Sequence, residues 1–339
     1  MTPNHNERCA IQIEPSRSIQ IVPEPNEKHL NEQQHADYRE YRWKFIQWMR
    51  NEGKNPEKAE GYSDYTAYES AYRTARFDRW TWSKTERYSV PPEPALATEY
   101  IEEDVIYRDV SNATKGKTEE ALARYYRYLA DNHPGCEWEH DQRFSSSGDD
   151  SPRDYLTRRE RRRVREAALA TESWREATIV LTSLDAALRP VEVARAKAGW
   201  VDTDNMLLRI PREDSSKNTD NWRTSLTSRT AEALEHWLED RAEDPMYDER
   251  EALWLTREGT QYSSRSLARL LRRLCDKADI DTGGRKMTWY SVRHSTGTYV
   301  AAERDLKAAK DQLRHQTPVT TMKYDQVPAE QRRSALEQI

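Results

Sequence analysis

A run of small and polar residues near the middle of the chain constrains the fold most, because it separates two stretches with helical patterns. Residues 144–152 read Phe-Ser-Ser-Ser-Gly-Asp-Asp-Ser-Pro, a composition that offers neither hydrophobic driving force nor helix propensity. A chain of 339 residues is long enough for two domains of ordinary size. We therefore predict a linker at 144–152 and one domain on each side of it.

The half before the linker is predicted to be helical. Residues 1–30 are rich in Pro, Asn and Glu and lack hydrophobic periodicity, so we expect a flexible leader there. Aromatic and apolar residues recur at helical spacing over residues 34–49 and 65–82, and a third helix is expected at 118–129. Together these stretches predict a helical domain at residues 31–143.

The half after the linker combines helices with two short strands. Thr157 and Glu160 form a capping-box pattern at the start of an arginine-rich helix. For its arginines the sequence leaves two roles open, a solvated face and contact with phosphate. Residues 205–211 and 222–226 have the composition of strands joined by a polar turn. The sequence therefore predicts a mainly α fold with a small antiparallel β-sheet, an α+β arrangement.

Composition excludes several classes of protein. The chain is 36% hydrophobic and 33% charged, without the ~18 consecutive apolar residues of a membrane span or the apolar segment of a secretory signal. We therefore predict a soluble cytoplasmic protein with no membrane partner. The three scattered cysteines argue against a disulfide framework. His133, Cys136 and His140 resemble half of a zinc site, but no second Cys/His pair follows, so we predict no metal site.

The net charge of -5 conceals an asymmetry between the halves. Residues 1–150 hold 20 Lys and Arg against 28 Asp and Glu, a net charge of -8. Residues 151–339 hold 34 against 31, a net charge of +3. Local clustering of basic residues matters more for binding nucleic acid than the total does, so the acidic total does not exclude a nucleic-acid partner.

A short C-terminal stretch, residues 313–324, places His315 nine positions before Tyr324. Both side chains can bind or attack a phosphate. A tyrosine hydroxyl has an unperturbed pKa of about 10, so it attacks only where neighbouring groups remove its proton or stabilise the developing charge. Taken alone, the pair favours a buried tyrosine beside a helix-capping histidine, and further groups are needed to make it a site.

Those further groups occur upstream. Residues 187–192, Ala-Leu-Arg-Pro-Val-Glu, carry Arg189; Lys217 lies in the predicted hairpin turn; residues 290–294, Tyr-Ser-Val-Arg-His, carry Arg293. In order and spacing, these groups and the C-terminal histidine and tyrosine resemble the tyrosine recombinase family, of the phage integrase type. Attack on a phosphodiester places extra negative charge on the phosphate oxygens, and two arginines fit that need.

The resemblance covers about residues 152–328 and implies a domain organisation. A catalytic domain would span residues 153–327, preceded by a helical core-binding domain that contacts DNA, and residues 328–339 would form a tail helix. It also implies an enzyme, a tyrosine site-specific recombinase that needs no metal or other cofactor. Its partners would be double-stranded DNA and further copies of the chain, as a homo-tetramer on paired sites. DNA integration by a mobile element or virus is the implied setting.

The resemblance further implies a role for each matched residue. Arg189 and Arg293 would hold the phosphate oxygens, because guanidinium groups stay protonated and offer forked donors. His315 would donate to the same oxygens. Tyr324 would attack and form a 3'-phosphotyrosine intermediate, while Lys217 would protonate the departing 5' oxygen as a general acid. The cut strand could then be rejoined to another strand without ATP or metal.

One position departs from the family pattern. Tyr290 stands where the second arginine box usually has a histidine three residues before its arginine. A tyrosine can hydrogen-bond the phosphate or the nucleophile, but it is a poor acid or base near neutrality. We interpret the neighbouring His294 as a packing residue. Two other functions stay open: a catalytically impaired DNA-binding protein that keeps the fold, and a type IB topoisomerase-like enzyme.

Overall fold

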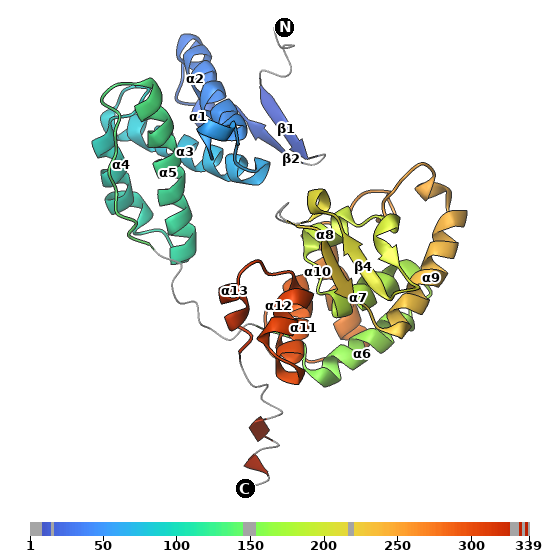
Figure 1. The fold of residues 1–339 in the computed structure, drawn as a ribbon. Coiled ribbons are helices and arrows are strands. Elements are labelled where there is room, and N and C mark those ends of the chain that lie inside the picture. The colour runs from blue at the N-terminus through green and yellow to red at the C-terminus, as the bar shows by residue number, and fades with distance from the viewer. Residues whose placement is uncertain are drawn as a thin grey trace. The chain divides into compact units, whose positions relative to one another are not determined.

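The chain folds into two compact units, Met1–Asp150 and Ser151–Ile339, which are drawn in Figure 1. The computed structural model describes residues 9–14, 17–144, 154–215, 220–325, 332–333 and 336–337. The division between the units falls inside the segment that the sequence predicts as a linker. Most of the predicted tail helix lies outside the described residues. The roles of the two domains stay predictions.

Unit 1 consists of a β-hairpin followed by helices. Its elements are β1 (Ala10–Glu14), β2 (Arg17–Gln20), α1 (Glu24–Glu27), α2 (Glu32–Asn51), η2 (Pro56–Lys58), α3 (Asp64–Thr85), α4 (Pro94–Tyr100), η3 (Ile101–Val105) and α5 (Asn112–Asn132). The strands pair antiparallel, with Ile11 opposite Ile19. We predicted a flexible leader here, but its described part is a hairpin and a short helix. The missed signal is the alternation of isoleucines, of which Ile11 and Ile19 are buried.

The core of unit 1 includes aromatic and aliphatic side chains of α2, α3 and α5, which pack against one another. A polar network lies within this core. The buried Asp78 carboxylate accepts hydrogen bonds from the hydroxyls of Tyr38, at 2.6 Å, and Tyr125, at 3.0 Å. The buried Arg42 guanidinium donates to the Ala71 carbonyl at 2.7 Å. A buried charge needs such partners, because each unpaired polar group would destabilise the folded state.

Unit 2 contains a small sheet surrounded by helices. Its elements are α6 (Arg158–Leu169), α7 (Trp174–Ala186), α8 (Pro190–Arg195), η4 (Ala198–Trp200), β3 (Val201–Asp202), β4 (Leu207–Ile210), η5 (Arg212–Asp214), β5 (Trp222–Ser225), α9 (Ser228–Glu243), η6 (Pro245–Tyr247), α10 (Ser264–Lys277), α11 (Trp289–Glu303), α12 (Leu306–Leu313) and α13 (Val319–Met322). Thr157 and Glu160 form the predicted capping box of α6. The mainly α fold with small antiparallel sheets is confirmed.

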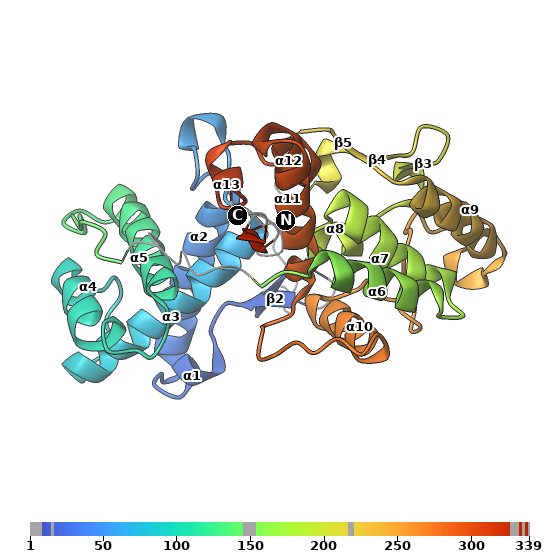
Figure 2. The same ribbon diagram turned by 90° about the horizontal axis from the view of Figure 1, so that it is seen from below.

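The sheet of unit 2 has the antiparallel order β3-β4-β5. The two predicted strands correspond to β4 and β5, whereas β3 was not predicted because it has only two residues. Helix α7 packs against α6, α9 and α11 (Figure 2), and every side chain from Ala177 to Ala186 is buried. The C-terminal end of α7 is therefore held from several sides.

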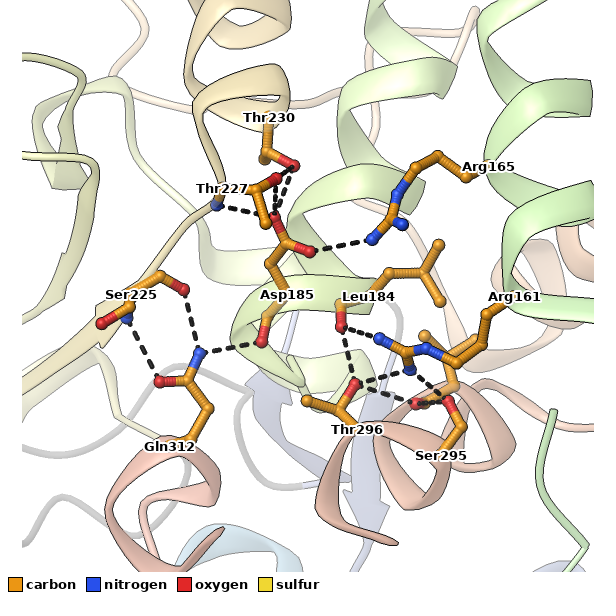
Figure 3. A network of polar contacts seen from close by, with 11 residues as sticks. Arg161, Arg165, Leu184, Asp185, Ser225, Thr227, Thr230, Ser295, Thr296 and Gln312 are labelled. Carbon is orange, nitrogen blue, oxygen red and sulfur yellow. Dashed lines mark hydrogen bonds and ion pairs between the residues drawn. The ribbon is translucent and has the colours of Figure 1, made fainter. Parts of the chain in front are cut away.

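A polar network fixes the end of α7 (Figure 3). The Asp185 carboxylate accepts hydrogen bonds from the hydroxyls of Thr227 and Thr230 and pairs with Arg165 at 3.0 Å. The Gln312 amide donates to the carbonyl oxygens of Asp185 and Ser225. These contacts join α7 to α6, α9, α12 and β5, so the residue that follows α7 has little freedom to move.

Candidate active site

The last carbonyl groups of α7 organise a cluster of arginines. Helix ends leave four carbonyls without partners in the helix, and their partial negative charge favours cations. Arg161 donates to the Leu184 carbonyl at 2.8 Å, and Arg314 donates to the Ala186 carbonyl. Arg293 donates to the Ala187 carbonyl at 2.6 Å. The end of this helix thus gathers guanidinium groups from three distant parts of the sequence.

Glu192 supplies a negative charge to this cluster. Its buried carboxylate lies 2.9 Å from the guanidinium of Arg189 and 2.7 Å from that of Arg314. Burial opposes its ionisation, but the positive charges of Arg314 and Arg189 outweigh this and lower the pKa of the carboxyl to about 2. Because Arg189 caps the N-terminus of α8 and Glu192 lies in its first turn, the helix start fixes the first arginine.

Arg293 lies on α11 and is 3% exposed. Its guanidinium also donates to the Leu313 carbonyl, so α11 and the end of α12 are joined through it. Burial, with the nearby charges of Arg314 and Arg189, lowers its pKa to about 9, so it stays protonated at neutral pH. Two of its five N–H donors are used in these backbone contacts, which leaves donors for a phosphate.

His315 follows α12 and is buried. Its Nδ1 atom lies 2.9 Å from the Thr321 hydroxyl oxygen, and its ring stacks on that of Tyr324 with centroids 6.0 Å apart. Burial, with the charges of Arg293 and Lys323, lowers the pKa of the imidazole to about 3. His315 is therefore neutral near pH 7 and is suited to donating a hydrogen bond rather than to accepting a proton.

Tyr324 is 4% exposed and lies against α11. Its hydroxyl oxygen is 2.8 Å from Nδ1 of His294. Gly297, one helical turn after that histidine, allows the close approach, since a Cβ atom there would lie 2.8 Å from Cε1 of Tyr324. The sequence predicts Arg189, Arg293, His315 and Tyr324 as site residues, and the fold brings these four together.

The other two predicted site residues are Lys217 and Tyr290. Lys217 lies outside the described residues. Tyr290 is 46% exposed at the start of α11, and its ring centroid is 6.3 Å from that of His294. Lys197 follows α8 and pairs with Asp214 at 3.1 Å.

Arginine side chains of helix α6 form contacts within unit 2. Arg161 and Arg165 take part in the network of Figure 3, and Arg158 pairs with Glu303. Arg163 lies 3.6 Å from Asp279. These arginines contact α7, α11 and the loop after α10. Contact of this helix with phosphate therefore stays a prediction.

Among the residues that the structure describes, neither a metal-binding cluster nor a membrane-spanning helix is found. Across the described ranges, no three His, Cys, Asp or Glu side chains gather in a way that could hold a metal ion. His140, from the half zinc pattern, instead lies 2.9 Å from the Glu119 carboxylate. No helix in the described part of the chain is long and apolar enough to cross a bilayer.

The sequence profile of the phage integrase family matches residues 154–331, more than half of the chain. The chain belongs to the phage integrase family. The matched range contains the whole cluster of arginines, histidines and tyrosine described above. No curated protein sequence shows significant similarity to the chain.

Solved structures share the fold at low sequence identity. XerH site-specific recombinase bound to difH substrate in a pre-cleavage complex matches with a TM-score of 0.61 and 17% identity, over 87% of this chain and 86% of that one. The Tn1549 transposon integrase in complex with circular intermediate DNA matches with a TM-score of 0.59 and 14% identity, over 87% and 99%. A lambda integrase dimer bound to a COC' core site gives 0.54 and 14%, over 83% and 77%.

Family membership confirms that the protein is a tyrosine recombinase, an enzyme of DNA recombination and integration. Sequence reasoning did not predict His294 and Arg314 as site residues. His294, predicted only to pack, is buried and also contacts the Tyr324 hydroxyl. Sequence reasoning could have singled out His294, because it lies one helical turn after Tyr290 on the same face of the helix. Arg314 gave no such signal, because only the folded chain brings it to Glu192.

Proposed function

We propose that the protein recombines specific DNA sites through a covalent intermediate on Tyr324. The observation that carries the proposal is the position of the Tyr324 hydroxyl, held beside a histidine within a cluster of buried arginines. Such a cluster suits a phosphodiester, because the attack adds negative charge to the oxygens and preorganised cations stabilise it. Family membership supports the same reading.

Each residue then has a role in the first transesterification. Arg189 and Arg293 hold the non-bridging phosphate oxygens, and neutral His315 donates a hydrogen bond to them. The Tyr324 oxygen attacks phosphorus and forms the 3'-phosphotyrosine bond as the bond to the 5' oxygen breaks. Lys217 protonates that 5' oxygen. Tyr290, exposed at the start of α11, contacts the phosphate through its hydroxyl.

The partner is double-stranded DNA, and we expect a homo-tetramer on paired sites. XerH, the Tn1549 integrase and lambda integrase are described in complex with DNA. The cytoplasmic localisation predicted from the sequence also stays a proposal, which cell fractionation would test.

The proposal is tested by trapping the covalent intermediate. Protein incubated with a pool of randomised duplexes and extracted with denaturant should retain covalently attached strands, whose sequences converge on the recognition site. On a nicked suicide substrate of that sequence, wild-type protein should form an adduct that Tyr324→Phe cannot form. Arg293→Ala should slow its formation by roughly 10²-fold or more. Tyr262→Phe, a buried tyrosine outside the cluster, is the matched control.

Other outcomes would identify the alternatives. Site-specific binding with no adduct from wild-type protein would favour a DNA-binding protein that keeps the fold. An adduct with any duplex, together with relaxation of supercoiled plasmid by the monomer, would instead favour a topoisomerase-like enzyme.

A further inference from the structure

The contact between His294 and Tyr324 involves the atom that would attack the phosphate. Nδ1 of His294 lies 2.8 Å from the tyrosine hydroxyl oxygen, which is a hydrogen-bonding distance. The ring centroids are 5.7 Å apart, and both residues are less than 9% exposed, at 8% and 4%. The contact is therefore sheltered from water, and it joins α11 to the segment after α13.

The neighbouring groups are poorer acceptors for the proton of Tyr324. His315 stacks on the Tyr324 ring, but its Nδ1 already contacts Thr321, and its low pKa makes it a weak base. Lys323 lies over the same ring, 5.2 Å from its centroid, and is a cation. Tyr290 is exposed, and a neutral tyrosine hydroxyl is a poor base.

We propose that His294 is a catalytic residue that accepts the proton of the Tyr324 hydroxyl as this oxygen attacks the phosphate. The inference rests on the proposed function. The O–H bond of Tyr324 breaks, its proton passes to Nδ1 of His294, and the oxygen–phosphorus bond forms. The bond between phosphorus and the 5' oxygen breaks, and a general acid protonates that oxygen. In the rejoining step, His294 returns its proton to Tyr324.

This role requires the neutral tautomer of His294 that carries its hydrogen on Nε2, so that Nδ1 accepts from the hydroxyl. Nitrogen-15 NMR of the DNA-free protein reads this tautomer directly. The Nδ1 signal should be that of an unprotonated nitrogen and should shift in Tyr324→Phe. A hydrogen on Nδ1 at neutral pH would overturn the assignment, because the histidine would then donate to the tyrosine.

The kinetic test compares His294→Ala and His294→Asn in single-turnover cleavage of the nicked suicide duplex. Asparagine keeps a hydrogen-bond acceptor near the position of Nδ1 but cannot take up a proton. Both variants should slow adduct formation by roughly 10²- to 10⁴-fold, the usual contribution of a general base, while binding the duplex as wild-type protein does. His236→Ala, whose side chain is 60% exposed on α9, is the matched histidine control.

One outcome would overturn the role of His294 alone. If His294→Asn cleaves within a few-fold of wild type, the histidine only positions the tyrosine.

A substrate with sulfur in place of the 5' bridging oxygen separates the two proton transfers, because a thiolate leaves without being protonated. This sulfur-containing substrate should not restore cleavage by His294→Ala. Restoration would assign His294 to the leaving group and overturn the proposal. A wild-type protein that forms no adduct even with this substrate would instead reject the proposed function, and with it this step.

Discussion

The Glu192 carboxylate lies 2.7 Å from the guanidinium of Arg314, whose side chain is completely buried. Arg314 has a φ of 57°, in the left-handed region that favours glycine. A larger residue there is strained by roughly 1–2 kcal/mol. The arginine offsets this strain because it also donates to the carbonyls of Ala186 and Ala187 at the end of α7.

A glycine at position 314 should therefore destabilise the fold less than a methionine does. Arg314→Met removes the charge and keeps the strain, so we expect the free energy of unfolding to fall by about 3–5 kcal/mol, as for a broken buried ion pair. Arg314→Gly should be about 1 kcal/mol less harmful, since it relieves the left-handed backbone. Urea denaturation measures both. The control is the ion pair of Arg209 with Asp202, whose arginine is 44% exposed, with Arg209→Met costing at most about 1 kcal/mol. A glycine variant less stable than the methionine variant would contradict the backbone argument.

Glu192 should make unit 2 sensitive to acid. Folding lowers the pKa of this carboxyl from 4.5 to about 2. Its contribution is therefore fully present above pH 4.5 and is lost as the pH falls through about 2. At 1.36 kcal/mol per pK unit, the contribution is about 3 kcal/mol. In Glu192→Gln, the free energy of unfolding should depend less steeply on pH between 5 and 3.

The measurement is urea denaturation at several pH values, with Glu251→Gln as the control because that carboxylate is 79% exposed. The control should keep the wild-type slope. An unchanged slope in Glu192→Gln would show that other carboxyl groups account for the acid sensitivity.

Much of the fold and several residues of the cluster could be predicted from the sequence, because they depend on local patterns. Helix periodicity, capping residues and the linker composition are local signals, and Arg189, Arg293, His315 and Tyr324 lie in recognisable short motifs. Contacts between residues far apart in the sequence do not follow from such local patterns. Arg314 and Glu192 are 122 positions apart, and nothing in either local sequence indicates that the two side chains meet.

Local sequence patterns also could not decide whether Tyr290 or His294 contacts Tyr324. The motif assigns it the place of a catalytic histidine, but residues 290 and 294 share one face of α11, and only the packing of α11 decides which side chain meets Tyr324. Similarly, the hairpin of β1 and β2 was missed because two short strands give too little alternation to stand out from a polar leader.

Gly297 should control the position of the nucleophile. A Cβ atom at this position would lie 2.7 Å from Cδ1 of Leu313 and 2.8 Å from Cε1 of Tyr324, closer than nonbonded carbon atoms approach. Gly297→Ala should therefore displace the Tyr324 ring. Misplacing the attacking group by about 1 Å can cost roughly 10²-fold in rate. Because alanine favours helix, α11 itself should not be weakened.

Single-turnover cleavage measures this effect, and DNA binding by the same variant should be retained. Gly199→Ala is the matched control, since a Cβ atom there would have no heavy atom within 4 Å. Wild-type cleavage by Gly297→Ala would indicate that Tyr324 does not attack from the position described.

Asp78 should give unit 1 the opposite dependence on pH. Burial raises the pKa of this carboxyl from 3.8 to about 6, although Arg42 and the hydroxyl of Tyr38 act against the rise. The folded state thus binds a proton more tightly, so this group favours folding most below pH 3.8, and its contribution declines by about 3 kcal/mol as the pH rises through 6. Asp78→Asn cannot titrate, so unit 1 of this variant should lose less stability than wild type between pH 4 and 7.

Pulsed hydrogen exchange of α3 peptides in increasing urea measures the stability of unit 1 within the whole chain. Asp64→Asn, at a half-exposed ion pair with Arg50, should behave as wild type, and an equal pH dependence in all three proteins would reject the assignment to Asp78.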